Sequence, residues 1–449
     1  MRIKIKNILL YICTLSVLVN QTCLASKYSS ALFWCSIVGY IFMLLYGGKK
    51  FGFKISGKKD ILFLVMLFLC NSLLSIVFNS ILQNDVDILA QSSKIWISYV
   101  LYFLALMLNS VAVPVNENKE LIRKLSQFLI RISFIPLFLG AFQAFFYESS
   151  IWFPFAYDGK LKWLGRYYTF FNNPNGHSAV LFILIGLCSY LKYTGSNNNK
   201  NKLTFVQVLC FVNMIMCASR GTLVGVIIAW VLIDYCRIRY CKSIRNQKNY
   251  LIKRSFSLMI IVIILYFGCN YLVRIVPAQI QNYLTQDTFC APITVYAQDN
   301  PEYTETSSLV RDYYEHGSDV SNERFEKWVY ALKTVCDSPL IGVGLYGSKF
   351  ISCHNGFISA LLAYGIVGLG TFLLIMIKIL NMIFVKASKI KSNSGLEQHI
   401  IVSAIVVGIM AITLTNDLLI FTFEFPNIIF YFLAGIILCE EEEVSYEKK

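Results

Sequence analysis

Long, uninterrupted apolar runs are the feature that most constrains the fold of this chain. The 449 residues are 56% hydrophobic and only 15% charged. A soluble protein of this composition would expose large apolar patches and aggregate. A helix of roughly 20 apolar residues crosses about 30 Å of hydrocarbon, whereas the strands of a membrane barrel alternate apolar and polar residues. The sequence therefore predicts an all-α polytopic membrane protein and excludes a barrel.

The apolar runs predict about twelve membrane spans. In chain order they are Ile8 to Leu24, Ala31 to Tyr46, Ile61 to Leu82, Trp96 to Val115, Phe128 to Tyr147, Gly176 to Leu191, Phe205 to Met216, Leu223 to Cys236, Leu258 to Val273, Phe357 to Leu380, Ile400 to Leu414 and Leu418 to Cys439. The N-terminus also resembles a signal peptide, but a retained first span makes the topology consistent.

The basic residues indicate the orientation of these spans. The formal net charge is +14, and lysines and arginines gather in every second connection, as in Lys49 to Lys59 and Arg237 to Arg254. Basic loops stay in the cytoplasm, so both termini are predicted to be cytoplasmic. This rule explains the positive charge without a nucleic acid partner.

Four regions follow from this topology. Residues 1–275 hold the first nine predicted spans, residues 276–354 form a large outward-facing loop, residues 355–439 hold the last three spans, and residues 440–449 are an acidic cytoplasmic tail. Three cysteines lie on the predicted outer side, at positions 290, 336 and 353, and a disulfide between two of them is an open alternative. The other cysteines fall mostly in apolar runs, where they act as small hydrophobes.

The large loop contains a predicted amphipathic helix. Ser321 suits its N-cap and Glu323 its first turn, and the segment Asp337-Ser338-Pro339 ends it. One apolar face is expected from residues at helical spacing, namely Phe325, Trp328, Val329, Leu332 and Val335. Such a helix lies on the membrane surface or on the helix bundle.

A histidine marks the point where this loop re-enters the membrane. His354 is one of four histidines in the chain, and its neutral imidazole suits removal of a proton from a sugar hydroxyl. A ring that merely hydrogen-bonds the next helix is an equally good interpretation. Arg220 lies between two spans on the side opposite the basic loops, so the charge bias does not explain it. A guanidinium that binds phosphate, or one that snorkels to lipid headgroups, explains it instead.

Other polar residues are candidates for contacts with a substrate as well. Arg324 lies on the amphipathic helix, and Arg311 lies earlier in the loop. Arg166 precedes a run that contains Asn173 and Asn175. The side-chain amides of this run can bind sugar hydroxyls, or they can form a turn and a helix cap. Asn355 also suits a helix cap. Glu424 lies in or near the last predicted span, where burying an acidic group in the membrane is energetically costly. It therefore suits pairing with an arginine or binding a substrate. Asp417 is expected at the outer edge of the same span.

The segment Gly342-Val343-Gly344-Leu345-Tyr346-Gly347 fits the pattern G-x-G-x-x-G. A dinucleotide-binding turn follows a strand, whereas this segment follows a predicted helix and Pro339. We therefore interpret it as a tight turn that returns the chain to the membrane, whose backbone amides suit an anionic ligand.

The order of several short motifs resembles the O-antigen ligase/O-antigen polymerase superfamily. The motifs are Ser219-Arg220-Gly221 between spans, Arg324-x-x-x-Trp328-x-x-Ala331-Leu332, Pro339-x-x-Gly342-x-Gly344, and His354-Asn355 opening an apolar helix. The resemblance runs from about Gly165 to about Gly370. The first five spans match only as generic apolar helices.

The resemblance implies a glycosyltransferase in the bacterial cytoplasmic (inner) membrane. It implies an undecaprenyl-diphosphate-linked glycan as donor on the outer face of this membrane, and a glycan or lipid as acceptor. It implies roles for Arg220, Arg324 and His354 in catalysis, with neither metal nor cofactor. A polysaccharide flippase and a chain-length regulator are the implied protein partners. Polymerase and ligase share these motifs, and the polymerase is favoured because a ligase needs a particular acceptor. A transporter or flippase is less favoured, since no internal repeat is seen and the candidate charges gather at one face.

Overall fold

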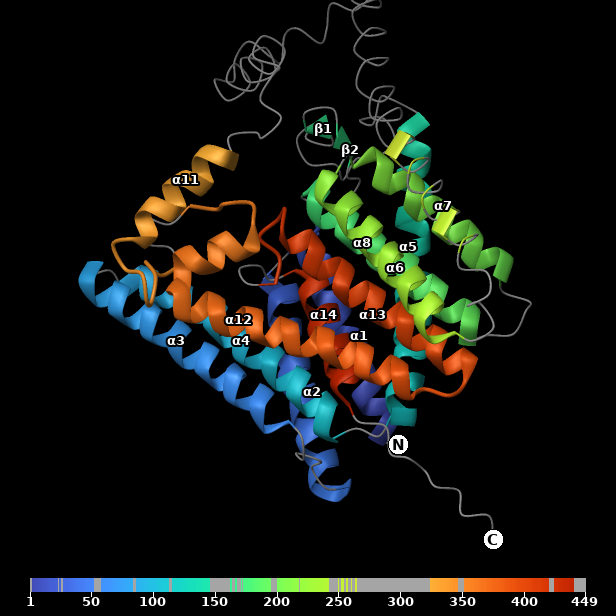
Figure 1. Ribbon diagram of the computed structural model, residues 1–449, viewed down its shortest axis with the longest axis horizontal. Coiled ribbons are helices and arrows are strands. Elements are labelled where there is room, and N and C mark those ends of the chain that lie inside the picture. Colours follow the sequence, from blue (N-terminus) through green and yellow to red (C-terminus); the bar gives the residue numbers. More distant parts are fainter. Residues whose placement is uncertain are drawn as a thin grey trace, which may run out of the picture.

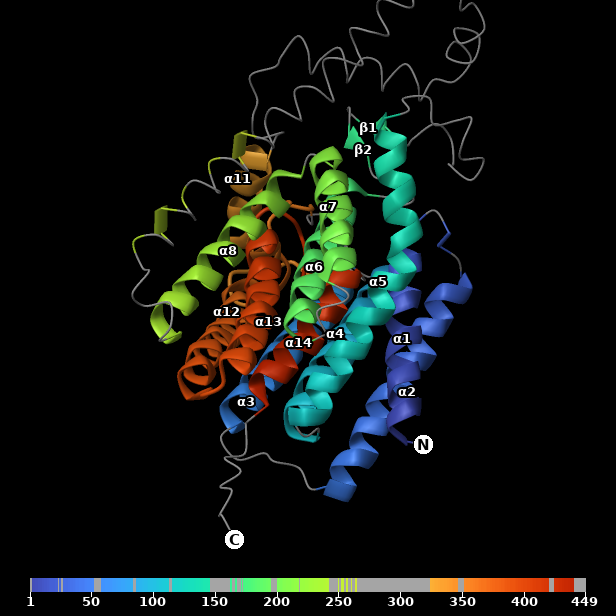
Figure 2. The ribbon, with the colours of Figure 1, turned by 90° about the vertical axis from the view of Figure 1, so that its right-hand side faces the viewer.

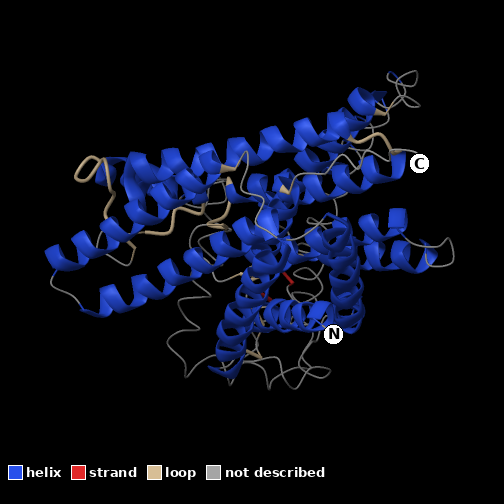
Figure 3. Ribbon diagram, turned by 90° about the horizontal axis from the view of Figure 1, so that it is seen from below, coloured by secondary structure: helices blue, strands red, loops and turns tan. Residues whose placement is uncertain are grey.

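Helices make up nearly all of the described structure (Figure 3). The computed structural model describes residues 2–22, 24–25, 27–51, 58–83, 86–112, 115–145, 162–163, 166–167, 171, 173–194, 200–217, 219–241, 324–345, 351–419 and 424–439, and a few single positions between 249 and 264. Most of the predicted span Leu258 to Val273, together with Cys290, Arg311, Ser321, Glu323 and residues 440–449, lies outside the described residues.

The helices follow the predicted apolar runs closely. They are α1 (Arg2–Asn20), α2 (Lys27–Phe51), α3 (Lys59–Gln83), α4 (Val86–Ala112), α5 (Val115–Phe145), α6 (Pro174–Thr194), α7 (Lys200–Met216), α8 (Arg220–Tyr240), α11 (Arg324–Val335), α12 (Gly356–Lys389), α13 (Asn393–Thr413) and α14 (Phe425–Leu438). Two short antiparallel strands, β1 (Lys162–Trp163) and β2 (Arg166–Tyr167), form a hairpin between α5 and α6.

Seven of the described helices are long and apolar enough to cross a membrane, namely α2, α3, α4, α6, α8, α12 and α13. Two shorter apolar segments, Ile5–Asn20 and Phe425–Leu438, accompany them. The all-helical polytopic fold is therefore confirmed. The total of about twelve spans and the outward direction of the large loop remain predictions.

The helices pack as neighbouring pairs around a central helix (Figures 1 and 2). Helix α3 lies against α12, α8 against α13, α6 against α7, and α1 against α2. Helix α14 packs against α4 and α13, and it is apolar around its whole circumference, as a fully buried helix must be. Its Tyr431 ring stacks on Tyr102 of α4 with centroids 5.4 Å apart.

Helix α12 is interrupted at Gly365. This residue has φ +67° and ψ −169°, outside the helical region. The break leaves backbone groups of α12 without helical partners, and these groups bond to residues 339–344. The Ile366 amide donates to the Pro339 carbonyl (2.8 Å). The amides of Val343 and Gly344 donate to the carbonyls of Leu362 (2.9 Å) and Ala363 (3.0 Å). Backbone groups that are buried among apolar side chains need such partners, because water does not reach them.

Polar side chains of α3 complete this joint. Asn71, Ser75 and Asn79 recur every four residues and therefore share one face of α3. They donate to the carbonyls of Tyr364 (2.9 Å), Ala363 (2.7 Å) and Gly342 (3.2 Å) in turn. The Gly-x-Gly segment is thus a tight turn, as predicted, with φ +72° at Gly342 and +78° at Gly344. Its glycines also let it dock directly on the broken helix.

Replacing Gly342 with Ala is expected to lower the free energy of unfolding by about 2–4 kcal/mol. The new Cβ atom would lie 2.4 Å from the backbone carbon of Ala363, and φ is positive there. Gly370→Ala is the matched control, because a Cβ atom at that position meets nothing within 4 Å. Thermal unfolding in detergent compares the two variants, and equal melting temperatures would contradict the docking role of Gly342.

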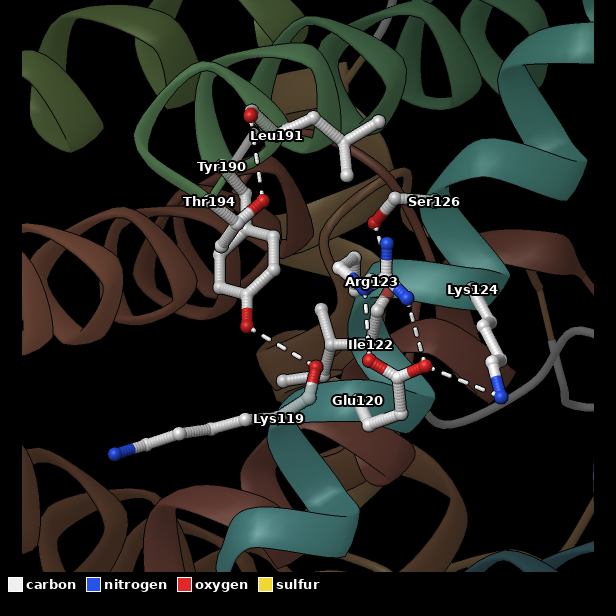
Figure 4. A network of polar contacts seen from close by, with 9 residues as sticks. All are labelled: Lys119, Glu120, Ile122, Arg123, Lys124, Ser126, Tyr190, Leu191 and Thr194. Atoms are coloured by element: carbon white, nitrogen blue, oxygen red, sulfur yellow. Dashed lines mark hydrogen bonds and ion pairs between the residues drawn. The ribbon is translucent and has the colours of Figure 1, made fainter. Parts of the chain in front are cut away.

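Ion pairs join helix ends at the opposite end of the bundle from α11. Lys6 of α1 pairs with Glu117 of α5 (3.4 Å), and Arg237 of α8 pairs with Glu397 of α13 (2.7 Å). Figure 4 shows a third group on α5, in which the Glu120 carboxylate bonds Arg123 and Lys124 beside Tyr190 of α6. These ends are the ones that the alternating basic connections predict to lie on one side of the membrane.

Candidate functional site

His354 lies in a short loop, residues 351–355, that leads directly into α12. Its φ is +50°, in the left-handed region that non-glycine residues seldom adopt. The Asp417 carboxylate holds this backbone by accepting the amide protons of His354 (3.2 Å) and Asn355 (3.1 Å). An uncommon backbone conformation that its surroundings fix in this way is typical of functional positions.

Asp417 connects the His354 loop to the turn between α13 and α14. Besides the two amides, it accepts hydrogen bonds from the hydroxyls of Ser359 (2.7 Å) and Ser352. In the same turn, the Asn416 carbonyl accepts the amide proton of Gly356 at 3.1 Å. The position of the imidazole therefore depends on residues more than sixty positions away in the sequence.

Arg220 reaches the same turn from α8. It is the first residue of this helix, and its side chain is exposed. The next residue, Gly221, packs so tightly on the turn that a Cβ atom there would lie 2.0 Å from Thr415 Oγ1 and 2.9 Å from Asn416 Nδ2. The missing side chain at position 221 thus sets Arg220 beside the Asp417 turn.

Arg324 reaches the site from α11, of which it is the first residue. The Trp328 indole donates to the Cys353 carbonyl (2.8 Å), so this helix is fastened to the His354 loop. Burial lowers the pKa of the Arg324 guanidinium, nearby Arg220 lowers it further, and Asp417 opposes them. An arginine nevertheless stays charged at neutral pH. Two guanidiniums therefore lie near each other and near one carboxylate.

The His354 ring is half-buried among these charges. Burial lowers its pKa, the Asp417 carboxylate raises it, and the cations of Arg324 and Lys327 lower it again. The net shift is downward, so the imidazole is neutral at pH 7 and can accept a proton. The cations of Arg220, Arg324 and Lys327, here called the basic cluster, suit a phosphate or diphosphate.

The apolar face predicted for α11 is covered by the helix bundle only in part. Val335 and the small residue Ala331 are buried against Cys353 and Leu362, and Trp328 packs beside them. Phe325 is 66% exposed and Leu332 is 51% exposed. Helical spacing identifies residues that share a face, but the position of the bundle decides which part of that face is covered.

A disulfide between positions 336 and 353, one of the pairings that the sequence left open, is not formed. Cys336 is a free, exposed thiol on the last turn after α11, and Cys353 is a free, buried thiol. The third candidate, Cys290, lies outside the described residues.

Several of the other predicted substrate-contact residues do not lie beside His354. Arg166 lies in β2, and Arg311 lies outside the described residues. The Asn355 Oδ1 accepts the amide protons of Phe357 (3.0 Å) and Ile358 (3.2 Å), which is the helix cap that the sequence indicated.

Asn173, Asn175 and Glu424 belong to a second place, where the start of α6 meets the start of α14. The Asn173 Oδ1 accepts the Asn175 amide proton at 2.8 Å, again as a helix cap. Glu424 precedes α14, and a Cβ atom on Gly176 of α6 would lie 3.9 Å from its Oε2. The substrate-binding roles of these residues stay predictions.

Two residues of the site were missed from the sequence. Asp417 was expected only as an acid at the outer edge of a span, and Lys327 was not singled out. Lys327 lies three residues after Arg324, which places both on one side of α11, and this spacing was available as a signal. Nothing in the local sequence indicates that Asp417 holds the loop of His354.

The pH dependence of activity is expected to report on His354. If neutral imidazole is the active form, the acid limb of kcat/KM falls below the ordinary histidine pKa of about 6.5. Lys327→Gln removes a cation that lowers the His354 pKa, so the limb should move to higher pH. Asp417→Asn removes the carboxylate that raises this pKa, so the limb should move to lower pH. Shifts of the same sign in both variants would contradict the assignment.

Residues 205–373 match the family model described as O-antigen ligase. The matched segment contains Arg220, Arg324, Lys327 and His354, and it ends before Asp417 and Glu424. No curated protein matches the chain. The family match supports the O-antigen ligase/polymerase superfamily, which the motifs already resembled.

Proposed function

From the match of residues 205–373 to the O-antigen ligase family, we propose that this protein is a membrane glycosyltransferase. In this proposal it polymerises undecaprenyl-diphosphate-linked oligosaccharide repeat units of O-antigen, capsule or exopolysaccharide. The observation that carries the proposal is the gathering of a neutral imidazole and the basic cluster at one end of a helix bundle. Such a site suits a donor whose leaving group is an anionic diphosphate.

The guanidiniums of Arg220 and Arg324 hold the diphosphate of the donor. Their planar forks match phosphate oxygens, and they offset the negative charge that grows on the leaving group as the anomeric C–O bond breaks. The half-buried setting of Arg324 strengthens this attraction, because charges interact more strongly away from water. Lys327 adds a third cation on the same helix.

His354 activates the acceptor. Its neutral ring takes the proton of an acceptor hydroxyl while the hydroxyl oxygen attacks the anomeric carbon in line, with inversion. The electron pair of the breaking C–O bond passes to the departing undecaprenyl diphosphate. The Asp417 carboxylate favours the imidazolium that results, because it raises the pKa of His354.

The membrane topology of the proposal follows from the charge pattern of the loops. About twelve spans place both termini in the cytoplasm and the large loop, with the site, on the outer face of the cytoplasmic membrane. The start of α1 and the end of α14 lie at the end of the bundle away from α11, which agrees with this arrangement (Figure 2). Arg166, Asn173, Asn175, Arg311, Asn355 and Glu424 are proposed substrate contacts.

The second candidate function is ligation of finished glycan to lipid A core or to a protein, since the matching family model is described as O-antigen ligase. The glycan profile of a deletion strain separates the two functions. A polymerase mutant loses the ladder and leaves one repeat unit on the acceptor. A ligase mutant accumulates lipid-linked polymer and leaves the acceptor bare, and an unchanged profile contradicts both.

A further inference from the structure

Glu424 carries a buried oxygen that the proposed mechanism does not use. Its Oε2 atom has no hydrogen-bond partner within the part of the chain that the structure describes. A buried carboxyl oxygen without a partner is costly, and native structures seldom leave one unsatisfied. Glu424 is therefore placed to accept a hydrogen bond from something that binds there.

Gln21 directs a donor to the same place. Its Oε1 accepts the amide proton of Phe425 at 3.1 Å, which fixes the amide so that its Nε2 faces α6. A Cβ atom on Gly176 would lie 3.3 Å from Gln21 Nε2 and 3.9 Å from Glu424 Oε2. A donor and an acceptor thus converge beside a residue without a side chain. A sugar hydroxyl, which both donates and accepts, matches this pair.

Charge decides which substrate this place suits. The buried Glu424 carboxyl lies close enough to Asp417 to interact with it electrostatically, so it lies near the turn that holds His354. A carboxyl group offers a diphosphate no attraction, whereas the basic cluster attracts one. A neutral sugar is the better ligand for this place. The sugar that binds nearest to the general base His354 is the acceptor sugar, because its hydroxyl group gives up the proton.

We propose that Glu424, Gln21 and Gly176 form a subsite for a hydroxyl group of the acceptor sugar, separate from the basic cluster that binds the donor diphosphate. The subsite rests on the proposed glycosyltransferase function, and it joins the ends of α1, α6 and α14. It assigns the basic cluster to the donor, and the Glu424 carboxyl with the Gln21 amide to the acceptor.

Kinetics in proteoliposomes test the subsite. Lipid-diphosphate-linked repeat units serve as donor, and a water-soluble oligosaccharide of the same repeat serves as acceptor. Glu424→Gln is expected to raise the acceptor KM roughly tenfold or more and to leave the donor KM within about twofold. Gly176→Ala should do the same, because its methyl group fills the space where the hydroxyl binds.

Two matched variants control for charge and for the added methyl group. Asp60→Asn removes one exposed carboxylate, which pairs with Lys378, and Gly370→Ala adds a methyl group that meets nothing within 4 Å. Both should leave the two KM values unchanged. If Glu424→Gln or Gly176→Ala raises the donor KM, or leaves the acceptor KM unchanged while the wild type is active, the subsite is overturned.

Direct binding separates this result from a failure of the proposed function. Saturation-transfer NMR measures the affinity of the protein for the same oligosaccharide without turnover. If the wild type binds the glycan, Glu424→Gln binds it roughly tenfold more weakly and neither transfers it, the subsite stands and the glycosyltransferase proposal falls. Equal binding by the wild type and Glu424→Gln overturns the subsite.

Discussion

Replacing His354 with Ala is expected to reduce glycan transfer by roughly 10²–10⁴-fold, the usual contribution of a general base. The imidazole is neutral because burial and the cations of Arg324 and Lys327 lower its pKa, so its loss removes the one group placed to take the acceptor proton in the proposed mechanism. Polymer formation by a complemented deletion strain and initial rates in proteoliposomes measure the effect.

The backbone at His354 needs a control of its own. Because its φ is +50°, alanine there adds strain as well as removing the base. Asparagine tolerates this conformation better than most residues. His354→Asn should therefore match His354→Ala in its loss of activity while keeping the melting temperature of the wild type. Near-normal polymer from His354→Asn would show that the ring has only a structural role.

Replacing Arg220 or Arg324 with Ala is expected to lower kcat by roughly 10²–10³-fold, as the loss of a group that stabilises transition-state charge usually does. Lysine at either position keeps the charge but loses the planar fork, so it should restore only part of the rate. The two arginines act on one diphosphate in the proposed mechanism. The double variant should therefore lose less than the product of the two single losses.

Arg123→Ala is the matched control for the arginine variants. Arg123 lies at the other end of the bundle, where it bonds Glu120 (Figure 4). Its removal should change stability by no more than about 1 kcal/mol, the usual value of an exposed ion pair, and leave kcat unchanged. Fully additive losses at Arg220 and Arg324, or a comparable loss at Arg123, would contradict a shared phosphate site.

The chemistry of the candidate site was more predictable than its geometry. The sequence singles out His354 because it is a polar residue at the start of an apolar run. It singles out Arg220 and Arg324 because each is a basic residue on the side of the membrane where the loops carry few basic residues. The structure brings all three residues together. The role of Asp417 was not predictable, because it depends on a turn more than sixty residues away folding back on the His354 loop. Local patterns carry no information about such a contact.

The sequence by itself determined the all-helical membrane fold, because the length of an apolar run and the need to pair every backbone group in lipid leave few alternatives. It also determined the helix cap at Asn355, which is a contact between near neighbours in the chain. Only the tertiary structure decided the break of α12 at Gly365, the docking of Gly342 on that break, and the convergence of Gln21 and Glu424. These features depend on close packing between distant segments, where a missing Cβ atom or one amide proton decides the fit.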